Sequence, residues 1–95
     1  MSSFEQRVFE GNRAKEVLDN EAYQGAFELL KQELRERWES SPARDAEGRE
    51  KLWLMTSLLN KLQVMLQTTL ETGQLAELDL KHRRTVLERM KSPFG

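Results

Sequence analysis

The hydrophobic pattern of the chain is strongest between Asp45 and Thr72. This stretch contains no proline and a single glycine, Gly48, near its start. Its apolar positions recur at alternating intervals of three and four residues, which places them on one side of an α-helix. The main stripe consists of Leu52, Met55, Leu59, Leu62, Leu66 and Thr69, and it is widened by Leu54, Leu58, Met65 and Leu70. Asp45 suits the N-cap and Gly73 suits the C-terminal end, so the pattern predicts a long helix over about residues 45–72, roughly 40 Å in length.

A second amphipathic helix is predicted from Glu21 to Ser40. Its broad apolar face consists of Ala22, Tyr23, Ala26, Phe27, Leu29, Leu30, Leu34 and Trp38. Asp19 or Asn20 can cap its start, and Pro42 disfavours helical geometry in the residue before it. The connection to the long helix is so short that we expect an antiparallel helical hairpin over residues 21–73, with Trp38 near the turn.

Shorter helices are expected at both ends, so the fold class is all-α with a single helical domain over residues 1–95. Gly11 and Asn12 interrupt the pattern, which predicts short helical pieces within residues 1–19, with Asn12 capping the second. At the other end we expect a break at Gly73, a separate C-terminal helix over residues 74–91 and a flexible tail over residues 92–95. If Gly73 only kinks the chain, the long helix would instead run on toward Met90.

The two main helices carry more apolar surface than they can hide in each other. Each apolar face spans close to 180°, and one partner helix cannot cover that width. The terminal segments or another copy of the chain must cover the remainder, and we expect self-association into a homo-oligomer.

Five residues are candidates for contact with a protein partner. Trp53 and Val64 lie off the main stripe on a polar face that includes Asn60, and tryptophan is the residue type most enriched at interface hot spots. Coverage by the chain's own ends is an equally good interpretation. Phe4 and Phe9 are expected to pack on the hairpin, or else to join the partner surface.

Composition narrows the class of protein. The 95 residues include 33% charged and 38% hydrophobic residues, with a net charge of −1. No apolar run approaches the roughly 20 residues that span a bilayer, no secretory signal is recognisable, and there is no cysteine. These features favour an intracellular, cytoplasmic protein without a membrane or disulfide role.

Enzymatic chemistry has little support in the sequence. His82 is the only histidine and lies between Lys81 and Arg83, where we expect a surface residue rather than a base or metal ligand. There is no phosphate-binding glycine loop, nucleophile elbow or metal-ligand spacing. We expect no enzyme activity, no cofactor, no metal and no small-molecule substrate.

The C-terminal segment is the best candidate for nucleic-acid binding. From Gln74 to Gly95 the chain carries five basic and three acidic residues. The basic residues are Lys81, Arg83, Arg84, Arg89 and Lys91. They scatter around a helix, and Glu77–Lys81 and Asp79–Arg83 are spaced for ion pairs, so an ordinary solvated helix is the favoured interpretation.

Several segments, taken in their order along the chain, carry a resemblance to a known class of proteins. They are residues 12–20 (NRAKEVLDN), Ala26-Phe27, Trp38, residues 41–55 (SPARDAEGREKLWLM) and residues 71–76 (ETGQLA). In this order the chain resembles small, all-helical proteins of tailed bacteriophages and prophages that are encoded near head and DNA-packaging genes. The resemblance implies viral assembly, in a virion or in the cytoplasm of an infected bacterium.

The resemblance also implies two alternatives to a self-assembling protein. One is a small terminase subunit that presents DNA to a packaging motor, although no helix-turn-helix is recognisable ahead of the hairpin. The other is a phage inhibitor that covers the surface of a host enzyme. Our sequence-based hypothesis is a non-enzymatic protein-interaction or assembly module that is phage-encoded and associates with itself through its wide apolar helix faces.

Overall fold

Three α-helices make up the part of the chain that the computed structural model describes, residues 3–91. They are α1 (Phe4–Leu18), α2 (Glu21–Ser40) and α3 (Ala46–Lys91). No strand occurs within these residues. The predictions of an all-α fold and of one long helix are therefore confirmed. The predicted flexible tail, residues 92–95, lies outside the described residues.

Local sequence signals account for the starts of all three helices. Ser3 accepts a hydrogen bond from the Gln6 amide at 3.1 Å, Asn20 from the Tyr23 amide at 2.9 Å, and Asp45 from the Gly48 amide at 3.1 Å. Each bond satisfies one of the amides that a helix N-terminus leaves without an intrahelical partner. The predicted bounds of α2 are confirmed, and within it Glu33 and Arg37, four residues apart, form an ion pair at 2.7 Å.

The break predicted at Gly73 is wrong, because α3 continues through this residue to Lys91. The interruption predicted at Gly11 and Asn12 is also wrong, since α1 is one continuous helix and its cap is Ser3. Neither glycine has a positive φ. Both are buried, and they face each other where α1 crosses α3.

The crossing of α1 and α3 explains why glycine occupies both positions. A Cβ on Gly11 would lie 2.8 Å from the Gly73 Cα and 3.2 Å from the Thr69 carbonyl oxygen, and a Cβ on Gly73 would lie 2.8 Å from the Arg7 carbonyl oxygen. Such distances are too short for any side chain, so the two backbones meet directly. Ala14 and Ala76, one turn further along each helix, are 5% and 2% exposed and extend this contact. The close approach offsets the cost of about 1 kcal/mol that glycine imposes on a helix interior.

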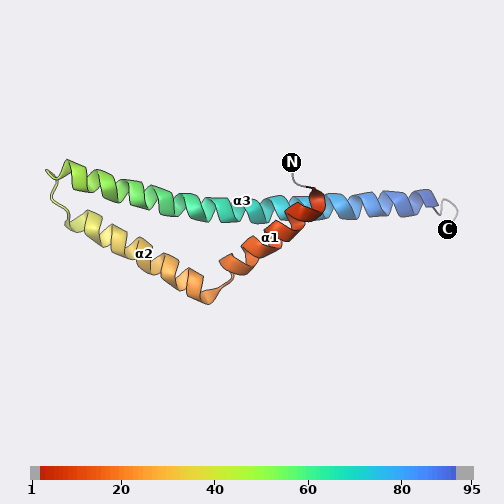
Figure 1. Cartoon of the computed structure of the whole chain (residues 1–95), viewed down its shortest axis with the longest axis horizontal. Coiled ribbons are helices and arrows are strands. Elements are labelled where there is room, and N and C mark those ends of the chain that lie inside the picture. The colour runs from red at the N-terminus through yellow and green to blue at the C-terminus, as the bar shows by residue number, and fades with distance from the viewer. Residues whose placement is uncertain (1–2, 92–95) are drawn as a thin grey trace.

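Helices α2 and α3 meet at the corner formed by residues 41–45. Figure 1 shows α2 (orange to yellow) running back from this corner along the first half of α3, with a separation that widens toward α1. At the corner, Arg49 stacks its guanidinium 4.1 Å from the Trp38 ring centroid and donates to the Ser41 hydroxyl at 2.9 Å. At the wide end, the Tyr23 hydroxyl of α2 donates a hydrogen bond to Gln63 Oε1 of α3 at 3.1 Å.

The molecule is long and thin. Its extents are 76 × 26 × 18 Å and its radius of gyration is 21.2 Å, whereas a compact chain of this length has a radius of about 12 Å. Helix α3 sets the length, since 46 residues at about 1.5 Å each span roughly 69 Å. Its last part (blue in Figure 1) extends beyond α1. No described helix is apolar over a length sufficient to cross a membrane.

Candidate interaction surfaces

The five residues predicted to contact a partner are split between two regions. Trp53, Asn60 and Val64 are exposed on α3, where Trp53 is 59% and Val64 61% exposed. Phe4 and Phe9 lie on α1, beyond the Gly11–Gly73 crossing from these three. The structure therefore does not bring the five together into one site. Their role in binding stays a prediction.

The two phenylalanines of α1 have different environments. Phe4 is half-buried, and the guanidinium groups of Arg7 and Arg83 lie 5.5 and 4.5 Å from the centroid of its ring. Phe9 is 58% exposed and is accompanied by Arg13 at 5.1 Å. The expectation that both rings pack on the rest of the chain thus fails for Phe9, because it points away from the face of α1 that carries Gly11 and Ala14.

A shallow groove joins Trp53 to α2 on one side of the α2–α3 pair. It is lined by Lys31, Leu34, Arg35, Trp38, Trp53 and Thr56. Two indole rings and two cationic side chains in one groove would suit an acidic or aromatic partner segment. Asn60 and Val64 lie further along α3 and do not line it.

The opposite side of the same pair carries a second groove, whose lining is almost entirely apolar. It is lined by Leu30, Leu34, Met55, Leu58, Leu59 and Leu62. Only Leu34 among these is buried, at 6% exposure, whereas Leu58 is 66% exposed. The sequence predicted that these leucines belong to two broad apolar faces, one on each helix, and that the two faces are too wide to cover each other. It did not reveal which edge stays uncovered, because that depends on where α1 and α2 lie.

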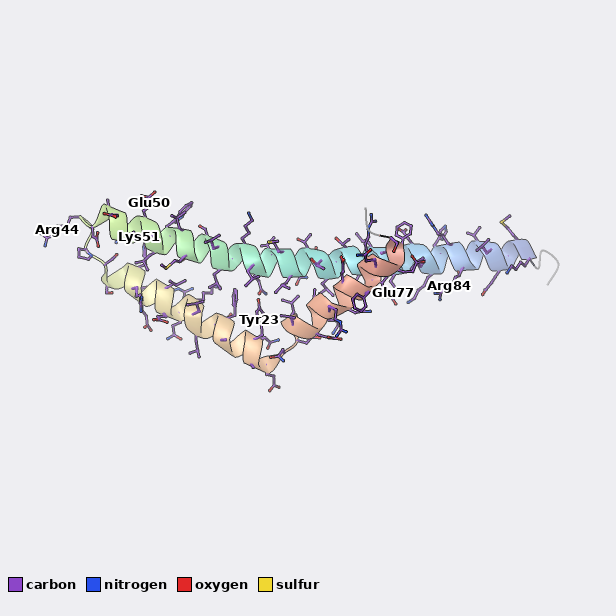
Figure 2. All side chains as sticks on the ribbon, in the orientation of Figure 1. Tyr23, Arg44, Glu50, Lys51, Glu77 and Arg84 are labelled. Atoms are coloured by element: carbon purple, nitrogen blue, oxygen red, sulfur yellow. The ribbon has the colours of Figure 1, made fainter. Side chains whose placement is uncertain are left out.

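The basic residues of the C-terminal segment are all exposed on the projecting end of α3. Lys81 pairs with Glu77 at 3.6 Å, as predicted. Arg83 stacks on Phe4, and the Asp79–Arg83 pair expected from spacing is not among the ion pairs of the described residues. Figure 2 shows the Arg84 side chain on the part of α3 beyond α1. The full exposed set is Lys81, Arg83, Arg84, Arg89 and Lys91.

Side chains suited to catalysis or metal binding do not cluster anywhere in residues 3–91. No group of three or more histidine, aspartate and glutamate side chains there is placed to hold a metal ion. No polar or charged residue of this range is buried, and His82 is exposed beside Arg83, Val86 and Leu87. The features that stand out are surfaces for contact: the tryptophan groove, the apolar groove and the basic end of α3.

Comparison of the chain with protein-family models, with curated proteins and with solved structures finds no significant match.

Proposed function

We propose that this chain is a non-enzymatic assembly module that associates with further copies of itself. The observation that carries the proposal is its accessible surface of 7908 Å². A compact folded monomer of 11.1 kDa exposes roughly 5,700 Å², so about 2,200 Å² is in excess. Obligate interfaces bury about 2,000–5,000 Å² summed over both partners, which matches an excess of this size on each chain.

Much of this excess accessible surface is apolar. Large hydrophobic residues that are at least 45% exposed occur on all three helices, and most lie on α3. Those on α2 and α3 are Leu29, Leu30, Trp53, Leu54, Met55, Leu58, Leu62, Val64, Met65, Leu75, Leu78, Leu87 and Met90. Complete burial of one such side chain contributes about 1.5–3 kcal/mol, so association would bring a large favourable free energy. The antiparallel hairpin expected from the sequence over residues 21–73 also belongs to this proposal.

The molar mass in solution tests the proposal directly. Sedimentation velocity and light scattering between about 1 and 100 μM should give a mass that is a multiple of 11.1 kDa. The melting temperature followed by circular dichroism should rise with concentration, because association stabilises the folded state by mass action. A mass of 11.1 kDa throughout, with a melting temperature independent of concentration, would refute self-association.

The biological setting that we propose is the assembly of a tailed bacteriophage. The support is the resemblance of residues 12–76 to small helical phage proteins, together with a shape suited to association. The position of the encoding gene tests the setting. A place among head and packaging genes supports it, and a place in an operon of host metabolism contradicts it.

A second candidate function is nucleic-acid binding by the projecting end of α3, such as a small terminase subunit would need. The favouring observation is that Arg84 and Lys91, seven residues apart and so on one helix face, are both exposed beyond the crossing with α1. Phosphate contacts by these side chains predict duplex binding that weakens steeply with added salt.

The matched test replaces Arg84 and Lys91 with alanine and compares the protein with a Lys51→Ala, Lys61→Ala control that loses the same charge elsewhere. The first double variant should lower the slope of log affinity against log salt by about 2, since each phosphate contact contributes about 0.9. Equal slopes for the two variants, or no duplex binding at low salt, would remove this candidate.

A further inference from the structure

The uncovered edge of α3 contains a short palindrome of apolar residues. Met55, Leu58, Leu62 and Met65 are spaced by three, four and three residues, and the order Met-Leu-Leu-Met is the same in both directions. Their exposed fractions are 53%, 66%, 47% and 59%. Spacing of this kind is that of the core positions of a coiled coil.

This palindrome lies beside the contact with α2 and not within it. Leu59 is half-buried on the α2 side of α3, and Leu58 is displaced from it by about 100° around the helix. Toward the C-terminus the same edge continues through Thr69 and Ala76, but there α1 covers it, leaving Ala76 only 2% exposed. The exposed part of this edge therefore ends at about Thr69, where α1 crosses α3.

We propose that the occupant of this edge is the same edge of a second copy, with the two α3 helices antiparallel about a twofold axis near residue 60. This inference rests on the self-association proposed above and specifies its geometry. Residue numbers that meet across the axis sum to about 120. Leu58 of one copy then faces Leu62 of the other, and Met55 faces Met65. The same four residues of each copy thus form both sides of the interface, as a twofold dimer requires.

The direction of pairing follows from the position of α1. In a parallel pair, the two Ala76 positions would face each other, and the two α1 helices already packed there would hold the α3 helices apart. In the antiparallel pair, residues 69 and beyond lie opposite residue 51 and earlier residues of the other copy. Each α1 then lies next to the start of the other copy's α3, residues 46–51, and leaves the seam itself, residues 54–66, open.

The charge and composition of the seam also fit a second copy. Lys61 is the only charged residue from Leu52 to Leu70, so apolar contacts meet no buried charge in this region. The twofold axis places both α2 helices on the same side of the α3 pair. Leu30, which borders the apolar groove and is 45% exposed, then contributes to the core of a four-helix arrangement.

Spin labels at single cysteines test the geometry, since the chain has no cysteine of its own. Nitroxides are placed separately at Lys61→Cys, Glu50→Cys and Glu88→Cys, all exposed positions of α3. The axial separation of equivalent labels is twice their distance from residue 60, at about 1.5 Å per residue. We expect a distance below about 20 Å at residue 61, roughly 30–35 Å at residue 50 and roughly 80–90 Å at residue 88.

The outcomes separate this inference from the proposed function. Short distances at all three positions would indicate parallel helices, and a long distance at residue 61 in an oligomer would indicate another interface. Either result overturns the antiparallel seam and leaves self-association intact. A monomeric mass with no dipolar coupling at any position overturns both.

A pair of substitutions provides a second readout. Leu58→Glu places a charge in the seam, and Leu78→Glu places one at an equally exposed leucine outside it, the two residues being 66% and 62% exposed. We expect Leu58→Glu to lower the dimer association constant at least 100-fold and Leu78→Glu to change it less than threefold, with the helical signal of the Leu78 variant retained. Equal effects of the two substitutions would contradict the seam.

Discussion

The contacts that α1 and α2 make with α3 are opposite in kind. At the α1 crossing, small residues let two backbones touch, and Gly11, Ala14, Gly73 and Ala76 are all buried. Along α2, large side chains meet α3 at one edge only, and Leu34 is the single buried residue of that helix. The crossing of small residues is buried within the chain, whereas much of the wide leucine and methionine surface stays exposed. The α1 contact fixes the shape of the monomer, and the α2–α3 pair carries the exposed apolar surface that we propose for association.

Substitution at the crossing should have the largest effect on stability. In Gly73→Leu, the new side chain would collide with the Arg7 carbonyl and the Gly11 backbone, because even a Cβ would lie 2.8 Å from each. We expect a loss of about 3 kcal/mol in the free energy of unfolding, measured by urea denaturation at fixed protein concentration. Gly25→Leu is the control, since no atom lies within 4 Å of a Cβ at Gly25. Leucine has a higher helix propensity than glycine, so Gly25→Leu should not destabilise α2, and equal losses in both variants would contradict the close crossing.

Truncation on the α2 side should have a smaller effect. Leu34→Ala removes the only buried side chain of α2, but it borders open grooves that can relax. We expect a loss of about 2 kcal/mol, at the low end of the range for buried leucine. Leu29→Ala is the control, because Leu29 is 70% exposed, and it should lose under about 0.5 kcal/mol. A larger loss at Leu29 than at Leu34 would reverse our assignment of the buried face of α2.

The corner between α2 and α3 should respond to loss of Arg49. In Arg49→Met, the stacking on Trp38 and the bonds to the Ser41 hydroxyl and carbonyl, at 2.9 and 3.4 Å, are removed while much of the aliphatic packing stays. We expect a loss of about 1 kcal/mol and faster amide hydrogen exchange in the last turn of α2. Arg44→Met, at an exposed position of the same corner, should leave both quantities unchanged.

The smallest expected effect is a gain. Gly25→Ala adds a methyl group into open space within α2 and should stabilise the protein by about 0.5–1 kcal/mol, because alanine loses less backbone entropy in a helix. The same change at Gly11 should destabilise, because its methyl group would meet the Gly73 Cα at 2.8 Å. Urea denaturation of both alanine variants gives the comparison, and a gain at Gly11 would contradict the close crossing.

The sequence by itself determined the elements that depend on neighbours along the chain. Asn20 and Ser41-Pro42 bound α2, Asp45 caps α3, and the Glu33–Arg37 and Glu77–Lys81 pairs follow from spacing alone. The excess width of the apolar stripe was also readable, because helical periodicity assigns every residue an angle around its helix.

Only the tertiary structure decided the roles of Gly11 and Gly73, the position of Phe9 and the edge of α3 that stays open. From the sequence alone, a glycine predicts a break in a helix, because it has no side chain whose contacts with neighbouring residues would stabilise the helix. Its advantage here comes from a second helix more than sixty residues away, which approaches closely because no side chain stands between the backbones. That crossing places α1 over one end of the apolar edge, and so determines which leucines remain exposed.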